Sequence, residues 1–109
     1  MPVVQGQPVE FLEWVEYDLI YAMDFYDSWL PDGADQILSR FREAVTWIER
    51  NPEQFPKRHR FFRRAIIRRT YFGIYFAIEP SVTTVLAVLD MRNDPRVIRA
   101  LLKLRRPKR

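Results

Sequence analysis

The chain of 109 residues has no cysteine, a single histidine and only three glycines. Without cysteine it can form no disulfide, no thiolate nucleophile and no cysteine-based zinc site, and this composition fits a reducing cytoplasm. No apolar run reaches the roughly 18 residues that a membrane-spanning helix needs. The first residues lack a basic start followed by an apolar core, which argues against a signal peptide. We therefore expect a cytoplasmic protein without a metal site or a cofactor.

The composition is that of a folded domain. Hydrophobic residues make up 48% of the chain and charged residues 29%, which is ordinary for a globular protein. At this length one domain can bury a single core without help from metals or disulfides. We predict one domain over residues 1–109, with a loose arm at 1–8 and a solvated basic tail at 105–109.

The net charge of +4 is distributed unevenly along the chain. Residues 1–56 carry three arginines against eleven acidic residues, a net charge of −8. Residues 57–109 carry fifteen basic residues against three acidic ones, a net charge of +12. We expect an acidic face and a basic face, unless the two halves neutralise each other across a packed interface.

Two stretches in the first half, residues 15–30 and 33–51, carry apolar residues at helical spacing. The Pro-Asp-Gly sequence between them breaks the first helix, and Asp32 is the expected N-cap of the second. So short a link predicts an antiparallel αα-hairpin. Val9–Trp14 is either a short strand or the first turn of a helix, and residues 52–56 form a compact turn.

The second half has apolar and β-branched residues over 63–69, 71–79 and 84–92, which predicts three short antiparallel strands. Asp94 and Pro95 then have the positions of an N-cap and of the first residue of a C-terminal helix. The helix pair can bury its apolar stripes only against a face of this sheet. We therefore predict an α+β fold in the order β-α-α-β-β-β. The antiparallel hairpin lies on one face of a small, mainly antiparallel twisted sheet, and a short C-terminal helix follows.

Arginines gather in and around these strands. Because alternate side chains of a strand share a face, we expect several guanidinium groups to converge on one cationic surface. Such a surface would bind phosphates or an acidic partner, since a guanidinium can hold an oxyanion through two hydrogen bonds. The alternative is a solvated face with ordinary salt bridges. The arginines concerned are Arg63, Arg64, Arg68, Arg69 and Arg92.

The aromatic stretch at residues 71–79 has two faces. We expect Tyr71 and Tyr75 to be exposed beside the arginines, where they could stack on nucleic-acid bases. The other face is expected to belong to the core: Phe72, Ile74, Phe76 and Ile78. We expect the three tryptophans to pack between helices and sheet, and His59, within a basic run, to lie at the surface.

Three motifs follow one another in the second half. They are an arginine-rich strand at 64–70, an aromatic strand at 71–79 and the segment 84–95 that ends in Arg-Asn-Asp-Pro. With the Ile-Glu-Arg-Asn-Pro sequence that follows the second helix, this combination resembles the RelE/ParE superfamily of toxins from bacterial type II toxin–antitoxin systems. The resemblance extends from about Glu10 to Leu102. It implies a small toxin of the plasmid-stabilisation kind, neutralised by a co-expressed antitoxin that wraps it.

The resemblance implies two modes of action. RelE-like members are endoribonucleases that cleave mRNA on the ribosome, whereas ParE-like members poison DNA gyrase and lack that catalytic set. Arg64 and Arg92 match basic positions of the family and Asp90 stands where a histidine is common, so these three are the catalytic candidates. RNA cleavage needs one group that takes a proton and another that returns it; Asp90 could be the base, and Tyr71 or Tyr75 the donor. The missing histidine and the lack of lysine on the strands favour the ParE-like mode, in which the protein is not an enzyme.

The expected partners are a cognate antitoxin and DNA gyrase, with the ribosome and mRNA as the alternative target. A homodimer and a hetero-oligomer with the antitoxin both stay open. A third interpretation is a non-catalytic basic module that binds nucleic acid or an acidic protein. The apolar stripe of the C-terminal helix either packs on the sheet or contacts the antitoxin: Val97, Ile98, Leu101 and Leu102.

Overall fold

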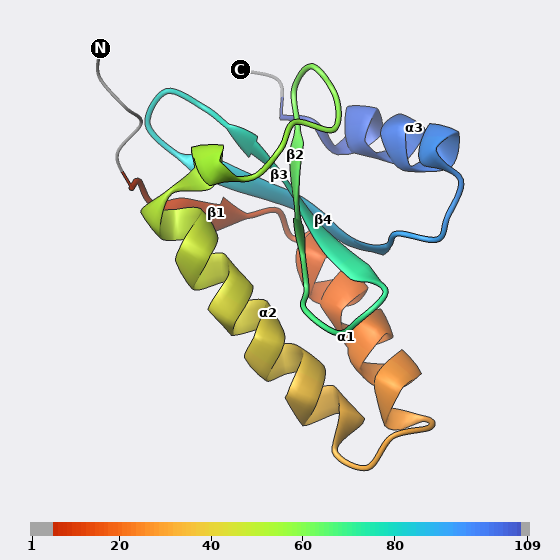
Figure 1. Cartoon of the computed structure of the whole chain (residues 1–109). Helices are drawn as coiled ribbons and strands as arrows, with labels where there is room; N and C mark the ends of the chain where they lie inside the picture. The colour runs from red at the N-terminus through yellow and green to blue at the C-terminus, as the bar shows by residue number, and fades with distance from the viewer. Residues whose placement is uncertain (1–5, 108–109) are drawn as a thin grey trace.

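The computed structural model describes residues 6–107. Its elements follow the predicted order and confirm the α+β class (Figure 1). They are β1 (Val9–Phe11), α1 (Trp14–Asp27), α2 (Gly33–Arg50), the short 3-10 helix η1 (Pro52–Gln54), β2 (Arg63–Ile66), β3 (Phe72–Ile78), β4 (Thr83–Asp90) and α3 (Pro95–Arg105). Residues 1–5 of the predicted arm and 108–109 of the predicted tail lie outside the described residues. Within residues 6–107, no helix combines the length and the apolar character that a membrane crossing needs.

The sheet has four strands in the order β1-β4-β3-β2. β1 runs parallel to β4 and the other two pairs are antiparallel, so the sheet is mainly antiparallel, as predicted. Figure 1 shows α1 and α2 side by side below the sheet and α3 above it. The predicted hairpin on one face is confirmed, and α3 adds a second helical layer on the opposite face.

The turn between α1 and α2 depends on two residues with special backbone requirements. Asp32 has a φ of 56°, in the left-handed region, and its side chain makes no capping hydrogen bond. An N-cap residue normally has extended backbone, from which its side chain reaches the first turn. Asp32 does occupy the predicted N-cap position, where its carbonyl accepts a hydrogen bond from the Gln36 amide at 2.9 Å, but its side chain does not cap the helix. At Gly33 an added Cβ would lie 2.2 Å from the carbonyl oxygen of Tyr26. Only glycine lets α2 begin this close to the end of α1.

The larger of two cores lies between the hairpin and the sheet. The stripes of α1 and α2 meet the face of β3 that alternation predicted, with Phe72, Ile74 and Phe76 almost fully buried. Burial of each such side chain stabilises the fold by about 1.5–3 kcal/mol. This gain explains why this face of β3 lies against the hairpin. The three tryptophans were expected to pack between the helices and the sheet, but each of them is about half exposed: Trp14, Trp29 and Trp47.

The smaller core lies under α3. Ile98 and Leu102 of α3 pack on Tyr75 and Leu86 of the sheet and on Phe62, which precedes β2. Tyr75 is 2% exposed, so its predicted exposure is wrong. Alternation does place Tyr75 on the face away from the hairpin, but α3 and Phe62 cover that face.

A β-bulge in β4 widens the apolar surface under α3. Tyr75 pairs with Ala87 but the next residue, Phe76, pairs with Val85, so Leu86 has no partner of its own on β3. Leu86 and Ala87 therefore both face α3. An extra residue of this kind also bends the strand and increases its twist.

Side chains cover the outer edge of β4 beyond the point where β1 ends. Asp18 of α1 accepts a hydrogen bond from the Val88 amide at 3.0 Å, and Arg105 of α3 donates to the Leu86 carbonyl at 3.1 Å. The two side chains also bind each other, with Nη1–Oδ2 and Nη2–Oδ1 distances of 2.5 and 3.0 Å. The side chain of Arg105 keeps only 13% of its exposure. Its assignment to a solvated tail is therefore wrong.

The described part of the N-terminal arm is fixed to the sheet. The Gln7 side chain donates to the Glu79 carbonyl at 3.1 Å and to Thr83 Oγ1 at 3.0 Å. The Thr83 amide donates to the Pro8 carbonyl at 2.9 Å. Residues 7–8 thus extend β1 along its neighbour, and they are not loose.

Candidate anion-binding site

A hollow of about 380 Å³ lies between the start of α3 and the sheet face beneath it. Three segments line it: the turn before β2, the strands β2 and β3 with the residue after β4, and the first turns of α3. We call it the cationic hollow, because its lining includes four basic side chains and no carboxylate. The lining residues are Lys57, Arg58, Phe62, Arg64, Tyr75, Met91, Pro95, Ile98 and Arg99.

The turn before β2 carries two of the cations. Lys57 forms an antiparallel bridge with Arg63, so the chain folds back on the strand at this point. The Phe62 carbonyl accepts hydrogen bonds from the amides of Arg58 and His59, at 3.1 and 3.3 Å. This tight loop holds Lys57 and Arg58 against the hollow.

The start of α3 supplies a third cation. Asp94 caps the helix as predicted, since its Oδ1 accepts from the Arg96 amide at 2.8 Å. Pro95 takes the first helical position, where no N–H donor is required. Arg99 stands one helical turn after Pro95, so both line the hollow from the same side of α3.

Arg64 reaches the hollow by lying across β3. A Cβ at Gly73 would lie 3.0 Å from both Cγ and Cδ of Arg64 and 3.1 Å from Sδ of Met91. The missing side chain at Gly73 therefore leaves the path that the aliphatic stem of Arg64 follows beside the Met91 thioether. A glycine inside a strand often marks such a close approach.

The pKa of the single histidine, His59, is affected by the positive charges around the hollow. The His59 ring stacks on Phe62 with a centroid distance of 5.3 Å and an interplanar angle of 11°. Loss of hydration lowers the pKa of His59 below 6.5, and the charges of Lys103, Arg60 and Arg99 lower it further. The imidazole is therefore neutral at pH 7, and the charge of this face comes from lysine and arginine.

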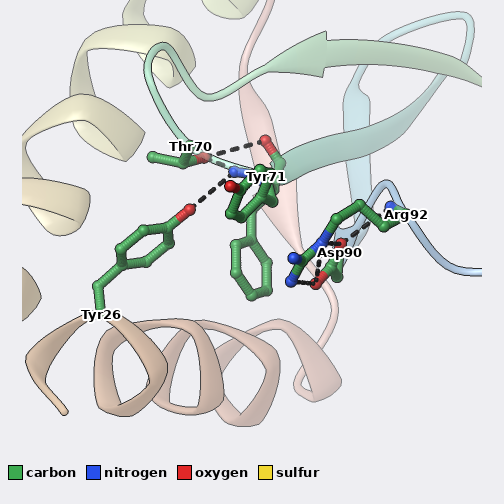
Figure 2. A network of polar contacts seen from close by, with 6 residues as sticks. Tyr26, Thr70, Tyr71, Asp90 and Arg92 are labelled. Atoms are coloured by element: carbon green, nitrogen blue, oxygen red, sulfur yellow. Dashed lines mark hydrogen bonds and ion pairs between the residues drawn. The ribbon is translucent and has the colours of Figure 1, made fainter. Parts of the chain in front are cut away.

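Arg92 and Asp90, two of the catalytic candidates, form a closed pair outside the cationic hollow (Figure 2). Nε and Nη2 of Arg92 bind both carboxylate oxygens at 2.7–3.2 Å, and its guanidinium lies 3.9 Å from the ring centroid of Tyr71. The side-chain hydrogen bond from Arg92 lowers the pKa of Asp90, which makes the carboxylate a weaker base. Figure 2 also shows Tyr26, whose hydroxyl accepts a hydrogen bond from the Tyr71 amide at 2.8 Å.

The other predicted arginines point elsewhere. Arg63 donates to two backbone carbonyls of the turn at residues 52–56, at 2.7 and 3.3 Å. Arg68 forms an exposed ion pair with Glu43 at 3.2 Å. Arg69 stands in the turn between β2 and β3 with a φ of 62°. The structure does not bring the five arginines to one surface, and their role in binding an anion stays a prediction.

Three of the four cations of the hollow, Lys57, Arg58 and Arg99, were not among the predicted anion-binding residues. Lys57 and Arg58 belong to the basic run that we placed at the surface, and Arg99 belongs to a helix of which only the apolar residues were considered. Arg99 could have been predicted from its spacing, because it follows Pro95 by one helical turn and so lies on the same side of the helix. Of the predicted residues, Arg64, Tyr75 and Ile98 line the hollow.

The four residues predicted to contact an antitoxin divide into two pairs. Ile98 and Leu102 are 7% and 0% exposed, packed in the core under α3. Val97 is 61% exposed, and Leu101 is partly exposed. Antitoxin contact stays a prediction for the outward pair.

The cationic hollow is suited to holding an anion. Guanidinium and ammonium groups are the usual donors to carboxylates and phosphates. RNA cleavage would also need a base and an acid. The only lining side chain that is neither basic nor apolar is Tyr75, and it is buried. The geometry therefore supports anion binding and places no acid–base pair among the lining residues.

Comparison with solved structures agrees with this fold. A structure described as the chromosomal ParDE TA system from P. aeruginosa matches with a TM-score of 0.66 and 17% sequence identity. The match covers 76% of this chain and 94% of that chain. No family model and no curated protein matches the sequence. The likeness at this identity shows that the two chains share a fold.

Proposed function

We propose that this chain is the toxin of a type II toxin–antitoxin pair and that it acts by binding an acidic surface of its target through the cationic hollow. The observation that carries the proposal is the hollow itself, with four cations and no carboxylate among its lining residues. Such a surface attracts and orients anionic groups. Two further points support it: the structural neighbour described as a ParDE TA system, and the resemblance of residues 64–95 to RelE/ParE toxins.

DNA gyrase is the target that we propose, in preference to mRNA on the ribosome. Cleavage at a 2′-hydroxyl needs a proton acceptor and a proton donor close to the phosphate. Asp90 is bound to Arg92 and lies outside the lining of the hollow, and Tyr75 is buried. These arrangements favour a toxin that works by binding over one that works as a nuclease.

The antitoxin would neutralise the toxin by filling the same hollow. An acidic segment could bring a carboxylate to Arg64 and Arg99, which are both lining residues. Charge-assisted hydrogen bonds of this kind contribute about 1.5–3 kcal/mol each. Antitoxin and target would then compete for one site.

The test uses the purified chain in a gyrase supercoiling assay, with a translating extract as the second arm. Wild-type protein should slow supercoiling or trap cleaved DNA, and it should leave mRNA intact. Arg64→Ala and Arg99→Ala should each weaken inhibition about tenfold or more, since each removes a charged donor. Arg42→Ala removes an exposed arginine of α2, outside the lining of the hollow, and should have no effect.

Two outcomes separate the hypotheses. Truncated mRNA without any effect on gyrase would refute the gyrase assignment and favour a ribosome-dependent endoribonuclease. Full inhibition by correctly folded Arg64→Ala and Arg99→Ala variants would refute the role of the cationic hollow. Rising salt should weaken target binding steeply if phosphate contacts dominate.

A further inference from the structure

A second hollow, of about 370 Å³, adjoins the cationic hollow. The two share Lys57 and Phe62 in their linings, so they meet at the loop that precedes β2. The cationic hollow takes its helical wall from the start of α3, whereas the second hollow is lined by Arg106 and Pro107 at the other end of this helix. Together they follow α3 along the loop at residues 57–62 (Figure 1). We call the two adjoining hollows the cationic trough.

Helix α3 presents a row of cations to this loop. Arg99, Lys103 and Arg106 have the i, i+4, i+7 spacing of one helix face. Arg99 lines the cationic hollow, and the guanidinium of Arg106 lies 4.5 Å from the ring centroid of Phe61. Loss of hydration is the main cause of the lowered pKa of His59 and the charge of Lys103 is the next, so Lys103 stands close to this ring. The whole row therefore faces the loop.

The loop supplies the opposite wall of the cationic trough. Lys57 and Arg58 line the first hollow, and Arg60 lines the second. Arg63 also lines the second hollow, but it donates to two backbone carbonyls and is not counted here. Within residues 6–107, no cation of either wall takes part in an ion pair. Two facing rows of unneutralised positive charge attract an anionic partner.

The length of the cationic trough favours an extended segment over a single anion. Helix α3 has 11 residues and a helix rises about 1.5 Å per residue, so the trough is about 16 Å long. An extended polypeptide advances about 3.3 Å per residue, so about five residues span this length. Successive side chains of such a segment point to opposite sides. Acidic side chains along it would therefore reach both walls of the trough.

Two features favour an acidic polypeptide over a nucleic acid. Phe62 is 3% exposed and Arg106 lies over the ring of Phe61, so neither ring is placed to stack on a base. Stacking on aromatic rings supplies much of the affinity for single-stranded nucleic acids. The second hollow also includes Glu53 and Glu79 in its lining. Their carboxylates repel a phosphate but can accept hydrogen bonds from the N–H groups of a peptide backbone.

We propose that the cationic trough binds an extended acidic segment of a partner protein, with about five residues lying along α3. Alternate carboxylates of the segment pair with the helical wall, formed by Arg99, Lys103 and Arg106. The carboxylates between them pair with the wall formed by the loop at residues 57–62. The proposal rests on the proposed function, because it takes the cationic hollow as one end of this longer site.

Calorimetric titration of the full chain with end-blocked glutamate peptides, at low ionic strength, tests the proposal. The probes are a peptide of two glutamates, which fits within the cationic hollow, and one of six, which is long enough to span the trough of about five residues. Wild-type protein should bind the longer peptide about tenfold or more tightly than the shorter one, because several additional ion pairs each contribute a few-fold.

Substitutions at the far end of the trough locate the added contacts. Lys103→Ala and Arg106→Ala should each weaken binding of the longer peptide about three- to fivefold, with less effect on the shorter one. Both residues are exposed, so the variants should fold normally. The matched control is Arg42→Ala, which removes an exposed arginine of α2 outside both linings and should leave the affinity for either peptide unchanged.

Two results would overturn the proposal. Equal affinity for the two peptides would show that the site ends with the cationic hollow. Tighter binding of an oligothymidylate of matched charge, dependent on Lys103 and Arg106, would assign the trough to nucleic acid instead. These titrations contain no gyrase, so a chain that fails to inhibit gyrase would refute the proposed target and leave the peptide results standing. Conversely, gyrase inhibition without a preference for the longer peptide would refute the longer site alone.

Discussion

Replacing Asp18 with alanine should lower the free energy of unfolding more than any other single change on the surface of α1. The carboxylate accepts two hydrogen bonds from Arg105 and one from the Val88 amide, and its side chain is 11% exposed. Its removal leaves a guanidinium with 13% exposure and a strand amide without their acceptor.

The expected loss is large because the charge left behind is poorly hydrated. Removing one partner of a buried ion pair typically costs about 3–5 kcal/mol. For a domain of this size about 1 kcal/mol lowers the melting temperature by roughly 4 °C, so a drop of about 12–20 °C is expected. Arg105→Ala should cost less, because the Asp18 carboxylate would keep the Val88 amide.

The measurement is urea and thermal unfolding of Asp18→Ala, Arg105→Ala and the double variant, at a concentration where the chain is monomeric. The double variant should lose less stability than the sum of the two single changes, since the second substitution removes the stranded charge. The matched control is the pair Glu43–Arg68, whose side chains are 52% and 64% exposed. Alanine at either of these positions should cost no more than about 1 kcal/mol.

A loss of stability in Asp18→Ala no larger than in Glu43→Ala would refute the strong stabilising role of the buried ion pair. Additive effects in the double-variant cycle would also refute it, because they would show that the two side chains contribute independently of each other. High salt should weaken the control pair and leave the Asp18–Arg105 pair nearly unchanged, because buried charges are screened less.

Three further predictions concern the cationic hollow and the pair at the end of β4. Gly73→Ala should fold with a modest loss of stability but weaken anion binding, measured by calorimetry with inorganic phosphate, because its Cβ would lie 3.0 Å from the Arg64 stem. Phosphate in the hollow should raise the pKa of His59, followed by NMR, because the anion offsets the nearby charges that lower it; an unchanged titration would place the phosphate elsewhere. The side-chain hydrogen bond from Arg92 lowers the pKa of Asp90 in the folded protein. The charged carboxylate therefore stabilises the wild type above the ordinary aspartate pKa of 3.8, and this stability is lost as the pH falls below 3.8. Asp90→Asn should lack this pH-dependent stability. The urea midpoints of the two proteins should then converge in acid.

Local patterns predicted the elements well. The helical periods gave α1 and α2, the Asp94-Pro95 sequence gave the start of α3, and alternation in β3 gave the face that meets the hairpin. These features depend on interactions between residues close in sequence, or on a single apolar face that has to be buried. The order of the strands along the chain came from the same patterns, whereas their spatial order, β1-β4-β3-β2, was not predicted.

The site was harder to predict because it depends on contacts between distant segments. Alternation places Tyr75 away from the hairpin, but nothing in its own strand shows that α3 covers it. Arg92 was expected beside Arg64. Its guanidinium lies instead over the ring of Tyr71, just before β3, and over the ring of Phe25, near the end of α1. Its place depends on the turn after β4, whose direction cannot be derived from strand periodicity.

The β-bulge at Leu86 has a consequence for how the chain can vary in length. Val85 faces the hairpin, Leu86 and Ala87 both face α3, and Val88 faces the hairpin again. If one residue between Val85 and Val88 were deleted, all the remaining side chains of β4 would stay on the face of the sheet that they occupy now. Loss of a residue anywhere else in the strand would turn over those that follow, since neighbouring positions point in opposite directions. Deletions that both cores tolerate should therefore be confined to this one point of β4.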